Sequence, residues 1–220
     1  MNRNELARVL ELRSRNYTER LDDKWEKVLE SHKWSSFYEP LRYATKDGKR
    51  IRPLILMLAG ESVGIPENKT DLAAVAVELL HTESIIHDDI IDNQIQRRNK
   101  DSFHLRYGNN TALLTADFVF GIILDIASRE NNPKIAKMIS SAALQMCEGE
   151  FQELNSDPNS HNMNWKEYIK LIKLKTASLF ESSSRLGAIL GKGNHQEELS
   201  QYGLSLGLAY QIQDDTSDWD

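Results

Sequence analysis

Cysteine, proline and glycine are scarce in this sequence of 220 residues. It contains one cysteine, Cys147, together with five prolines and eleven glycines. A single cysteine cannot form an internal disulfide and provides no zinc-thiolate spacing, so we expect the chain to work in a reducing compartment, the cytoplasm. Because few residues break helices, long segments remain in which apolar residues recur every three or four positions.

Positive net charge and long apolar runs are also lacking. The formal net charge is −6 at pH 7, which argues against a nucleic-acid partner because phosphate backbones favour basic surfaces. The charged N-terminal segment lacks the apolar core of a signal peptide, and no run approaches the roughly 18 apolar residues of a membrane span. Hydrophobic residues make up 40% of the chain and charged residues 27%. The composition therefore predicts a globular protein with no transmembrane segment.

The apolar periodicity predicts an all-α fold, a bundle of six or more helices. A first helix is expected at about residues 4–31. Another is expected from Leu72 to the region of Asp88, with Thr70 or Asp71 as its N-terminal cap. No segment alternates with the two-residue period of a β-strand over a useful length.

Further along, Asn164 and Glu167 have the spacing of a capping box. They predict a helix that begins there and reaches about Leu190. The polar, turn-rich segment 155–162 just before it predicts a loop.

Two aspartate clusters each follow an apolar helical segment. The first, in HDDIID, contains Asp88, Asp89 and Asp92, and QDDTSD near the end of the chain repeats the pattern. Residues at i and i+4 share a helical face, where like charges repel by about 0.2–0.5 kcal/mol and the negative end of the helix dipole adds to the repulsion. A bound cation is the simplest compensation, and carboxylates alone favour magnesium or calcium. The alternative is a solvated acidic face.

Cationic residues accompany these clusters. The segment GKRIRP supplies Lys49 and Arg52, while Arg97 and Arg98 follow Asp92 closely enough to fold back beside the first cluster. Arginine forks bind phosphate oxygens in pairs and lysine adds a compact charge, so these residues suit a substrate with two phosphates. A solvated basic loop is the alternative reading of each segment.

Three further residues, each outside the acidic and basic motifs, could contribute to the metal and phosphate sites. His81 lies two helical turns before Asp88 on nearly the same face, although a lone histidine is more often structural. Gln211 precedes Asp215 by one turn. Lys175 lies in an apolar segment, where an unpaired ammonium would be costly to bury and a phosphate partner would compensate its charge.

Taken in order, these motifs resemble the trans-isoprenyl diphosphate synthases of the geranylgeranyl and farnesyl diphosphate synthase type. The resemblance runs through GKRIRP, HTESIIHDDIIDNQIQRR, EGE at 148–150, Lys175-Thr176 and YQIQDDTSD. It implies an isoprenoid-synthase helical bundle around a central active-site cavity, as one domain over residues 1–220. Family members continue past the second aspartate motif, so we expect this domain to lack the family's C-terminal helices. Asn99 and Ala116 stand where the family usually has glycine.

The resemblance also implies a reaction, a magnesium cofactor, a homodimer and a role for each motif residue. An allylic diphosphate would be joined to isopentenyl diphosphate. Isopentenyl diphosphate would be bound by Lys49, Arg52, His81 and Arg98. The allylic diphosphate would be bound by Arg97, Lys175, Thr176 and Gln211. Magnesium would be held by Asp88, Asp89 and Asp92 on one wall of the cavity and by Asp214, Asp215 and Asp218 on the other. The residues expected to assist loss of the diphosphate are Asp88, Asp92, Arg97, Lys175 and Asp214.

The expected product is geranylgeranyl diphosphate. In the resembling family, the positions four and five before the first aspartate often limit chain length, and here they are Ser84 and Glu83 rather than aromatic residues. Two alternatives remain open. A class I terpene cyclase is disfavoured because it needs no isopentenyl diphosphate site such as GKRIRP. An inactive or regulatory subunit of a heteromeric prenyl synthase is the non-enzymatic reading.

Overall fold

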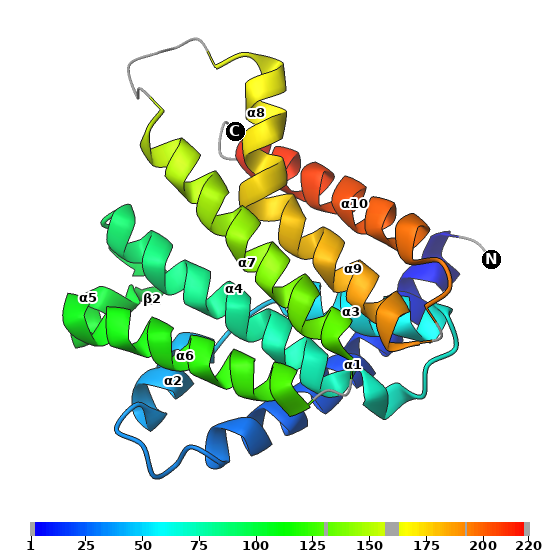
Figure 1. The fold of residues 1–220 in the computed structure, drawn as a ribbon, viewed down its shortest axis with the longest axis horizontal. Helices are drawn as coiled ribbons and strands as arrows, with labels where there is room; N and C mark the ends of the chain where they lie inside the picture. The colour runs from blue at the N-terminus through cyan, green and yellow to red at the C-terminus, as the bar shows by residue number, and fades with distance from the viewer. Residues whose placement is uncertain (1–2, 130–131, 157–162, 192, 218–220) are drawn as a thin grey trace. The chain divides into compact units, whose positions relative to one another are not determined.

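The computed structural model of the chain describes residues 3–129, 132–156, 163–191 and 193–217. Ten α-helices account for most of these residues (Figure 1). The helices are α1 (Arg3–Glu30), α2 (Tyr38–Thr45), α3 (Ile51–Ser62), α4 (Asp71–Ile91), α5 (Phe103–Tyr107), α6 (Asn109–Arg129), α7 (Pro133–Leu154), α8 (Trp165–Ile172), α9 (Ser178–Leu190) and α10 (Gln196–Ser217). The shorter elements are a 3-10 turn at Glu67–Lys69, the strands β1 (Gln96–Arg97) and β2 (Lys100–Asp101), and a π-helical turn at Lys173–Ala177.

The predicted all-α fold is confirmed, and helices α1 and α4 fall where the sequence placed them. The capping box is also present: the Asn164 side chain accepts from the Glu167 N–H at 3.1 Å, and the Glu167 carboxylate accepts from the Asn164 N–H at 3.1 Å. The helical segment that follows reaches Leu190, as predicted, but it passes through the π-helical turn, which periodicity did not reveal. The predicted loop at 155–162 lies largely outside the described residues.

The two short strands were not predicted. They pair antiparallel, with Gln96 opposite Asp101 and Arg97 opposite Lys100. A strand of two residues is too short to leave an alternating pattern in the sequence, so this hairpin has no periodic signal.

Clustering of backbone contacts divides the chain into two compact units. The first comprises residues 1–57 and 71–129, and the second comprises residues 58–70 and 130–220. The single domain inferred from the sequence stays a prediction.

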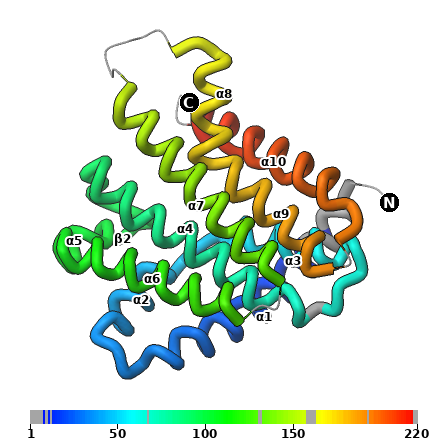
Figure 2. Tube along the Cα trace, viewed as in Figure 1, coloured from blue at the N-terminus to red at the C-terminus, as the bar shows by residue number. Residues whose placement is uncertain are grey.

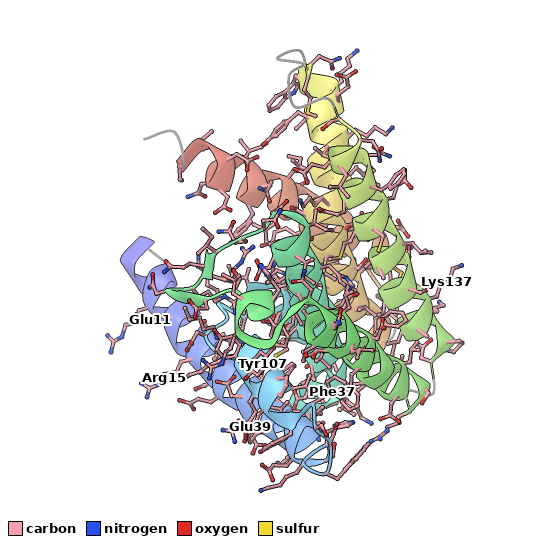
Figure 3. All side chains as sticks on the ribbon, turned by 90° about the vertical axis from the view of Figure 1, so that its left-hand side faces the viewer. Glu11, Arg15, Phe37, Glu39, Tyr107 and Lys137 are labelled. Carbon is pink, nitrogen blue, oxygen red and sulfur yellow. The ribbon has the colours of Figure 1, made fainter. Side chains whose placement is uncertain are left out.

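In the first unit, α4 is the central helix. Every residue from Ala73 to Leu80 is buried, which is typical of a helix that is enclosed on all sides. Helices α4 and α6 run side by side (Figure 1), and α1 also packs on α4. The charged side chains of Glu11 and Arg15 point away from this unit along the outer face of α1 (Figure 3).

Helix α6 corrects one expectation from the sequence. Within the described residues it is the one helix long and apolar enough to cross a membrane by length and composition, with a mean hydropathy of 1.7. The core helices of globular proteins pass the same test, and in this unit Ala112, Ala116 and Phe103 form a buried cluster with Ile86 of α4.

In the second unit, α7, α9 and α10 lie side by side (Figure 2). Helix α9 is buried along nearly all its length, including Phe180 and Leu186. The π-helical turn that leads into α9 contacts both α7 and α10. This arrangement brings the segment around Lys175 next to the last turns of α7 and α10.

Candidate active site

The first aspartate cluster lies at the C-terminal end of α4. Asp88 and Asp89 are in its last turn, and Asp92 follows the last helical residue by one position. The Asp92 N–H donates to the Asp88 carbonyl at 2.8 Å, so the two residues keep the one-turn spacing predicted for them. Asp92 is exposed and Asp88 half-buried, whereas Asp89 is only 2% exposed. The three carboxylates therefore have different surroundings.

Asp89 is paired with Arg97. The Nε and Nη2 atoms of Arg97 donate to the same oxygen of Asp89, at 2.9 and 2.7 Å. The chain thus leaves α4 and folds back through the hairpin, as the spacing of Arg97 suggested. The buried carboxylate of Asp89 therefore already has a cationic partner, and the two hydrogen bonds fix the orientation of the Arg97 guanidinium.

The turn of this hairpin places Arg98 and Asn99 at positive φ, 54° and 60°. Positive φ at both central residues is typical of the two-residue turns that join twisted antiparallel strands. Asparagine tolerates this region, which explains how Asn99 can stand where the family usually has glycine. Arginine rarely adopts it, and such residues are frequent at functional sites.

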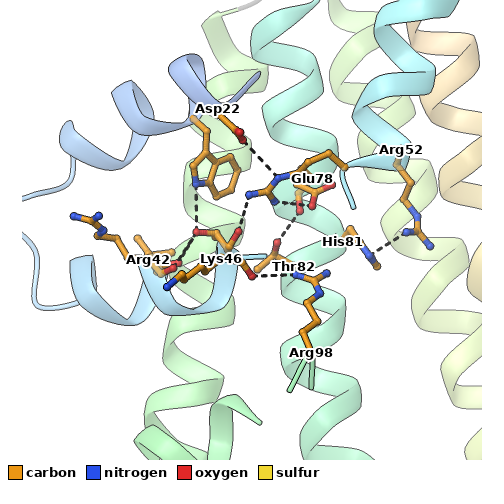
Figure 4. A network of polar contacts seen from close by, with 12 residues as sticks. Asp22, Arg42, Lys46, Arg52, Glu78, His81, Thr82 and Arg98 are labelled. Carbon is orange, nitrogen blue, oxygen red and sulfur yellow. Dashed lines mark hydrogen bonds and ion pairs between the residues drawn. The ribbon is translucent and has the colours of Figure 1, made fainter. Parts of the chain in front are cut away.

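His81 and Arg52 form a direct contact between α4 and α3, within the first unit (Figure 4). Arg52 Nη1 lies 3.0 Å from His81 Nε2. Because arginine has donors only, Nε2 must accept, and the ring is the neutral form protonated at Nδ1. Burial, followed by the positive charges of Arg52, Arg98 and Arg97, holds the pKa of His81 well below its ordinary value. The cations around this ring would attract an anionic ligand.

The loop that carries Lys49 is held to α4 by a buried ion pair between Arg50 and Glu78 (Figure 4). Arg50 Nη1 lies 2.8 Å from Glu78 Oε1, and Arg50 Nη2 donates to the Thr45 carbonyl at 2.6 Å. A Cβ atom on Gly48 would lie 2.9 Å from both charged groups, so a larger residue there would have to displace the ends of these two side chains. Lys49, between Gly48 and Arg50, remains exposed.

The hairpin is attached to the same loop. Arg98 Nη1 donates to the Lys46 carbonyl at 3.3 Å (Figure 4), and Lys100 Nζ donates to the Tyr43 carbonyl at 2.9 Å. The first unit therefore places the predicted diphosphate ligands Arg52, His81, Arg97 and Arg98 along the C-terminal half of α4 and in the hairpin that follows it.

The second aspartate cluster lies in the last turns of α10. Asp214 is exposed, and Asp215 is half-buried. Both oxygens of Asp215 accept hydrogen bonds, one from the hydroxyl of Tyr168 on α8 and one from Gln211 Nε2 at 2.7 Å. Gln211 Oε1 in turn accepts from the Thr176 hydroxyl at 2.8 Å. Asp218 lies outside the described residues.

Lys175 lies in the π-helical turn and is paired with two carboxylates of α7. Its Nζ is 2.7 Å from Glu150 Oε2, and it also donates to Glu153. These carboxylates balance the charge of Lys175 in the structure. The assignment of Lys175 to the allylic diphosphate stays a prediction. A Cβ on Gly149 would lie 2.6 Å from the backbone nitrogen of Lys175, so glycine allows α7 and the turn to approach this closely.

The two aspartate clusters supply oxygen ligands of the kind that magnesium prefers. Within the described ranges, no group of three or more His, Cys, Asp or Glu side chains is close enough together to hold a metal by itself. Magnesium commonly takes one or two carboxylates and completes its shell with water and substrate phosphates. In the same ranges the side-chain carboxylates of Asp92 and Asp214 have no hydrogen-bonding or ion-pair partner, so their oxygens fit such a metal when a diphosphate is bound.

Comparison with known proteins defines the family. Residues 35–220 match the model of the polyprenyl synthetase family, and the chain belongs to this family. It is 32% identical over 212 residues to the geranylgeranyl diphosphate synthase of Methanosarcina mazei, a match that covers 93% of this chain and 65% of the relative. It is 35% identical over 176 residues to the octaprenyl diphosphate synthase of Haemophilus influenzae, covering 78% and 53%. The chain thus spans about half to two thirds of these curated relatives.

Solved structures agree with the isoprenoid-synthase fold. A geranyltranstransferase from Thermotoga maritima is 33% identical, with a TM-score of 0.86 over 93% of this chain and 78% of that one. A polyprenyl synthase from Caulobacter crescentus, solved with calcium and isoprenyl diphosphate, is 30% identical, with a TM-score of 0.81 over 96% of this chain and 64% of that one.

Sequence reasoning missed several residues of these networks. Glu78 had a detectable signal, because an acidic residue inside the apolar run Ala73–Leu80 needs a buried partner. Tyr168 and Gly149 had none, because their roles depend on residues far away in the chain.

Proposed function

We propose that the chain is a prenyltransferase that joins isopentenyl diphosphate to an allylic diphosphate. The observation that carries this proposal is the cationic group along the C-terminal half of α4, where Arg52 contacts the neutral ring of His81 and the charges of Arg98 and Arg97 also lower the pKa of that ring. A diphosphate would accept hydrogen bonds from these arginines and would add negative charge beside them. Membership of the polyprenyl synthetase family supports the same reaction.

In the proposed reaction, the C–O bond of the allylic diphosphate breaks and the diphosphate leaves with the electron pair. The double bond of isopentenyl diphosphate attacks the allylic cation, a new C–C bond forms, and a proton is lost to make the new double bond. Lys49, Arg52, His81 and Arg98 would hold isopentenyl diphosphate. Arg97, Lys175, Thr176 and Gln211 would hold the allylic diphosphate. Their contribution would be electrostatic, through positive charges and hydrogen-bond donors directed at the diphosphate.

We propose magnesium as the cofactor, held by Asp88, Asp92 and Asp214, with Asp218 in support. When bound, it would neutralise charge on the departing diphosphate. Asp89 and Asp215 act through Arg97 and Gln211 in this proposal, because their oxygens already accept hydrogen bonds from those residues. The calcium in the Caulobacter crescentus structure supports a divalent cation.

The proposed product is geranylgeranyl diphosphate, although the relatives include octaprenyl synthases. Ser84 is small, and its hydroxyl bonds the His81 carbonyl at 3.0 Å, so it leaves room for a growing chain. Ser84→Phe should shift products to shorter chains while the first condensation continues. An unchanged product distribution would show that the chain grows along another wall.

We also propose a homodimer. Leu113, Phe120 and Leu124 are 48%, 38% and 56% exposed, and their spacing places them in one stripe on the outer face of α6. A second copy of the chain can cover this stripe with the same stripe across a two-fold axis. Phe120→Lys should sediment as a monomer, whereas Tyr202→Lys on α10 should remain dimeric. A wild-type chain that sediments as a monomer at micromolar concentration would overturn the dimer.

The reaction is tested by incubating the purified chain with magnesium, labelled isopentenyl diphosphate and allylic primers of several lengths. Labelled prenyl diphosphates longer than the primer are expected. A product that is cyclic and contains no label would indicate a terpene cyclase. Labelled product only after a second prenyl synthase component is added would indicate a regulatory subunit, a reading kept because one relative is component 2 of the Bacillus subtilis heptaprenyl synthase. The proposed cytoplasmic location is tested by cell fractionation.

A further inference from the structure

Tyr168 on α8 begins a series of hydrogen bonds that ends at Thr176, a predicted ligand of the allylic diphosphate. Its hydroxyl donates to one oxygen of Asp215, and Gln211 Nε2 donates to the other at 2.7 Å. Gln211 Oε1 accepts from the Thr176 hydroxyl at 2.8 Å. This series of hydrogen bonds therefore runs from α8 through two residues of α10 to the π-helical turn, and all of its residues lie within the second unit.

The chemistry of these groups decides which of them donates and which accepts in each hydrogen bond of the series. An ionised carboxylate can only accept, so Gln211 must turn its NH2 group toward Asp215. Its carbonyl oxygen then faces Thr176, and the Thr176 hydroxyl must donate its proton to that oxygen. The lone pairs of the Thr176 oxygen are left for other partners. The orientation of one amide thus decides whether Thr176 presents a donor or an acceptor.

We propose that Tyr168 is a positioning residue for prenyl transfer. Its hydroxyl holds the Asp215 carboxylate in one rotamer, which fixes the Gln211 amide and, through it, the proton of Thr176. Burial and the hydrogen bond to Asp215 raise the pKa of Tyr168 to about 12, so the hydroxyl stays protonated at working pH. This inference rests on the proposed function, in which Thr176 and Gln211 lie at the allylic substrate.

Removal of the hydroxyl should loosen this order without removing any ligand. In Tyr168→Phe, one oxygen of Asp215 loses its donor, and the carboxylate can rotate and let the Gln211 amide reverse. Only molecules with the correct orientation would react. We expect kcat to fall about tenfold, because the chemical step becomes slower. The KM for isopentenyl diphosphate should stay within about twofold of the wild-type value.

The kinetic experiment compares Tyr168→Phe with Tyr202→Phe. Tyr202 lies on α10, is 59% exposed and serves as a matched control that should behave as wild type. Equal kcat in wild type and Tyr168→Phe would overturn the inference. So would a loss confined to KM for isopentenyl diphosphate.

A second experiment tests the relay without any activity. The hydroxyls of Tyr168 and Thr176 share no direct hydrogen bond within the described residues, and the hydrogen bonds that connect them pass through Asp215 and Gln211. Tyr168→Phe, Thr176→Val and the double variant are unfolded in urea. A double variant whose midpoint shift is clearly smaller than the sum of the single shifts supports the relay. Additive shifts overturn it, and because this result needs no product, failure of the proposed reaction would be recognised separately.

Discussion

Arg50 Nη1 lies 2.8 Å from Glu78 Oε1, and the two side chains are 10% and 3% exposed. The pair fastens the loop that carries Lys49 to the central helix α4. Arg50 has a positive φ of 55°, a conformation that costs energy for a side chain of this size and persists only when neighbouring groups hold it. The ion pair and the Thr45 carbonyl are those groups.

Loss of Glu78 should therefore destabilise the chain. In Glu78→Ala, Arg50 keeps its charge in a buried position, and the Asp22 carboxylate, 3.9 Å from Arg50 Nε, is its remaining ion-pair partner. Removal of one partner from a buried pair costs up to about 3–5 kcal/mol. Glu78→Gln keeps an acceptor and should lose less. Urea unfolding measures both variants. The control is Glu19→Gln, which breaks an exposed pair with Arg15 and should change stability by less than about 1 kcal/mol. Equal effects in the Glu78 and Glu19 variants would contradict the role of the buried pair.

Gly149→Ala should disturb the π-helical turn. The new methyl group would lie 2.6 Å from the Lys175 nitrogen and 2.9 Å from its Cα, and backbone atoms cannot turn aside as a flexible side chain can. We expect a loss of about 1–3 kcal/mol in unfolding free energy, together with lower activity because Lys175 moves. Gly121→Ala has open space around the new methyl and should be neutral or slightly stabilising. A Gly149→Ala chain as stable and active as wild type would refute the close approach.

The low pKa of His81 predicts a pH dependence of stability. The folded chain binds fewer protons at His81 than the unfolded chain, whose histidines titrate near about 6.5. Stability from this group is therefore complete above that pH and is lost as pH falls below it, by at most about 1.4 kcal/mol per pH unit. His81→Gln cannot take up the proton, so its unfolding free energy should fall less than that of wild type between pH 7 and pH 5.5. His195→Gln, at an exposed histidine, should keep the wild-type dependence; identical pH profiles for all three chains would exclude the effect.

The sequence predicted the parts of the structure whose causes are local. The capping box of Asn164 and Glu167 and the one-turn spacing of Asp88 and Asp92 follow from residues three or four positions apart. The π-helical turn left no periodic signal, and it packs closely against Gly149, which is distant in the chain.

The same limit explains what was missed at the site. Asp89 and Asp215 look like further metal ligands in sequence, but their partners, Arg97 and Tyr168, are identified only once the chain has folded. The sequence identified these charged groups as candidates and could not show which carboxylates already accept hydrogen bonds.

The central claim is that carboxylates of both aspartate clusters support magnesium-dependent prenyl transfer. The most direct measurement is the rate at which labelled isopentenyl diphosphate enters product in wild type, Asp88→Asn and Asp214→Asn, with magnesium and with excess chelator. The account predicts that each variant keeps its helical circular dichroism but loses turnover by at least about a hundredfold, a change of roughly 2.7 kcal/mol in the barrier. It also predicts that chelator abolishes wild-type turnover. Full wild-type turnover in chelator, or full turnover in either variant, would contradict it.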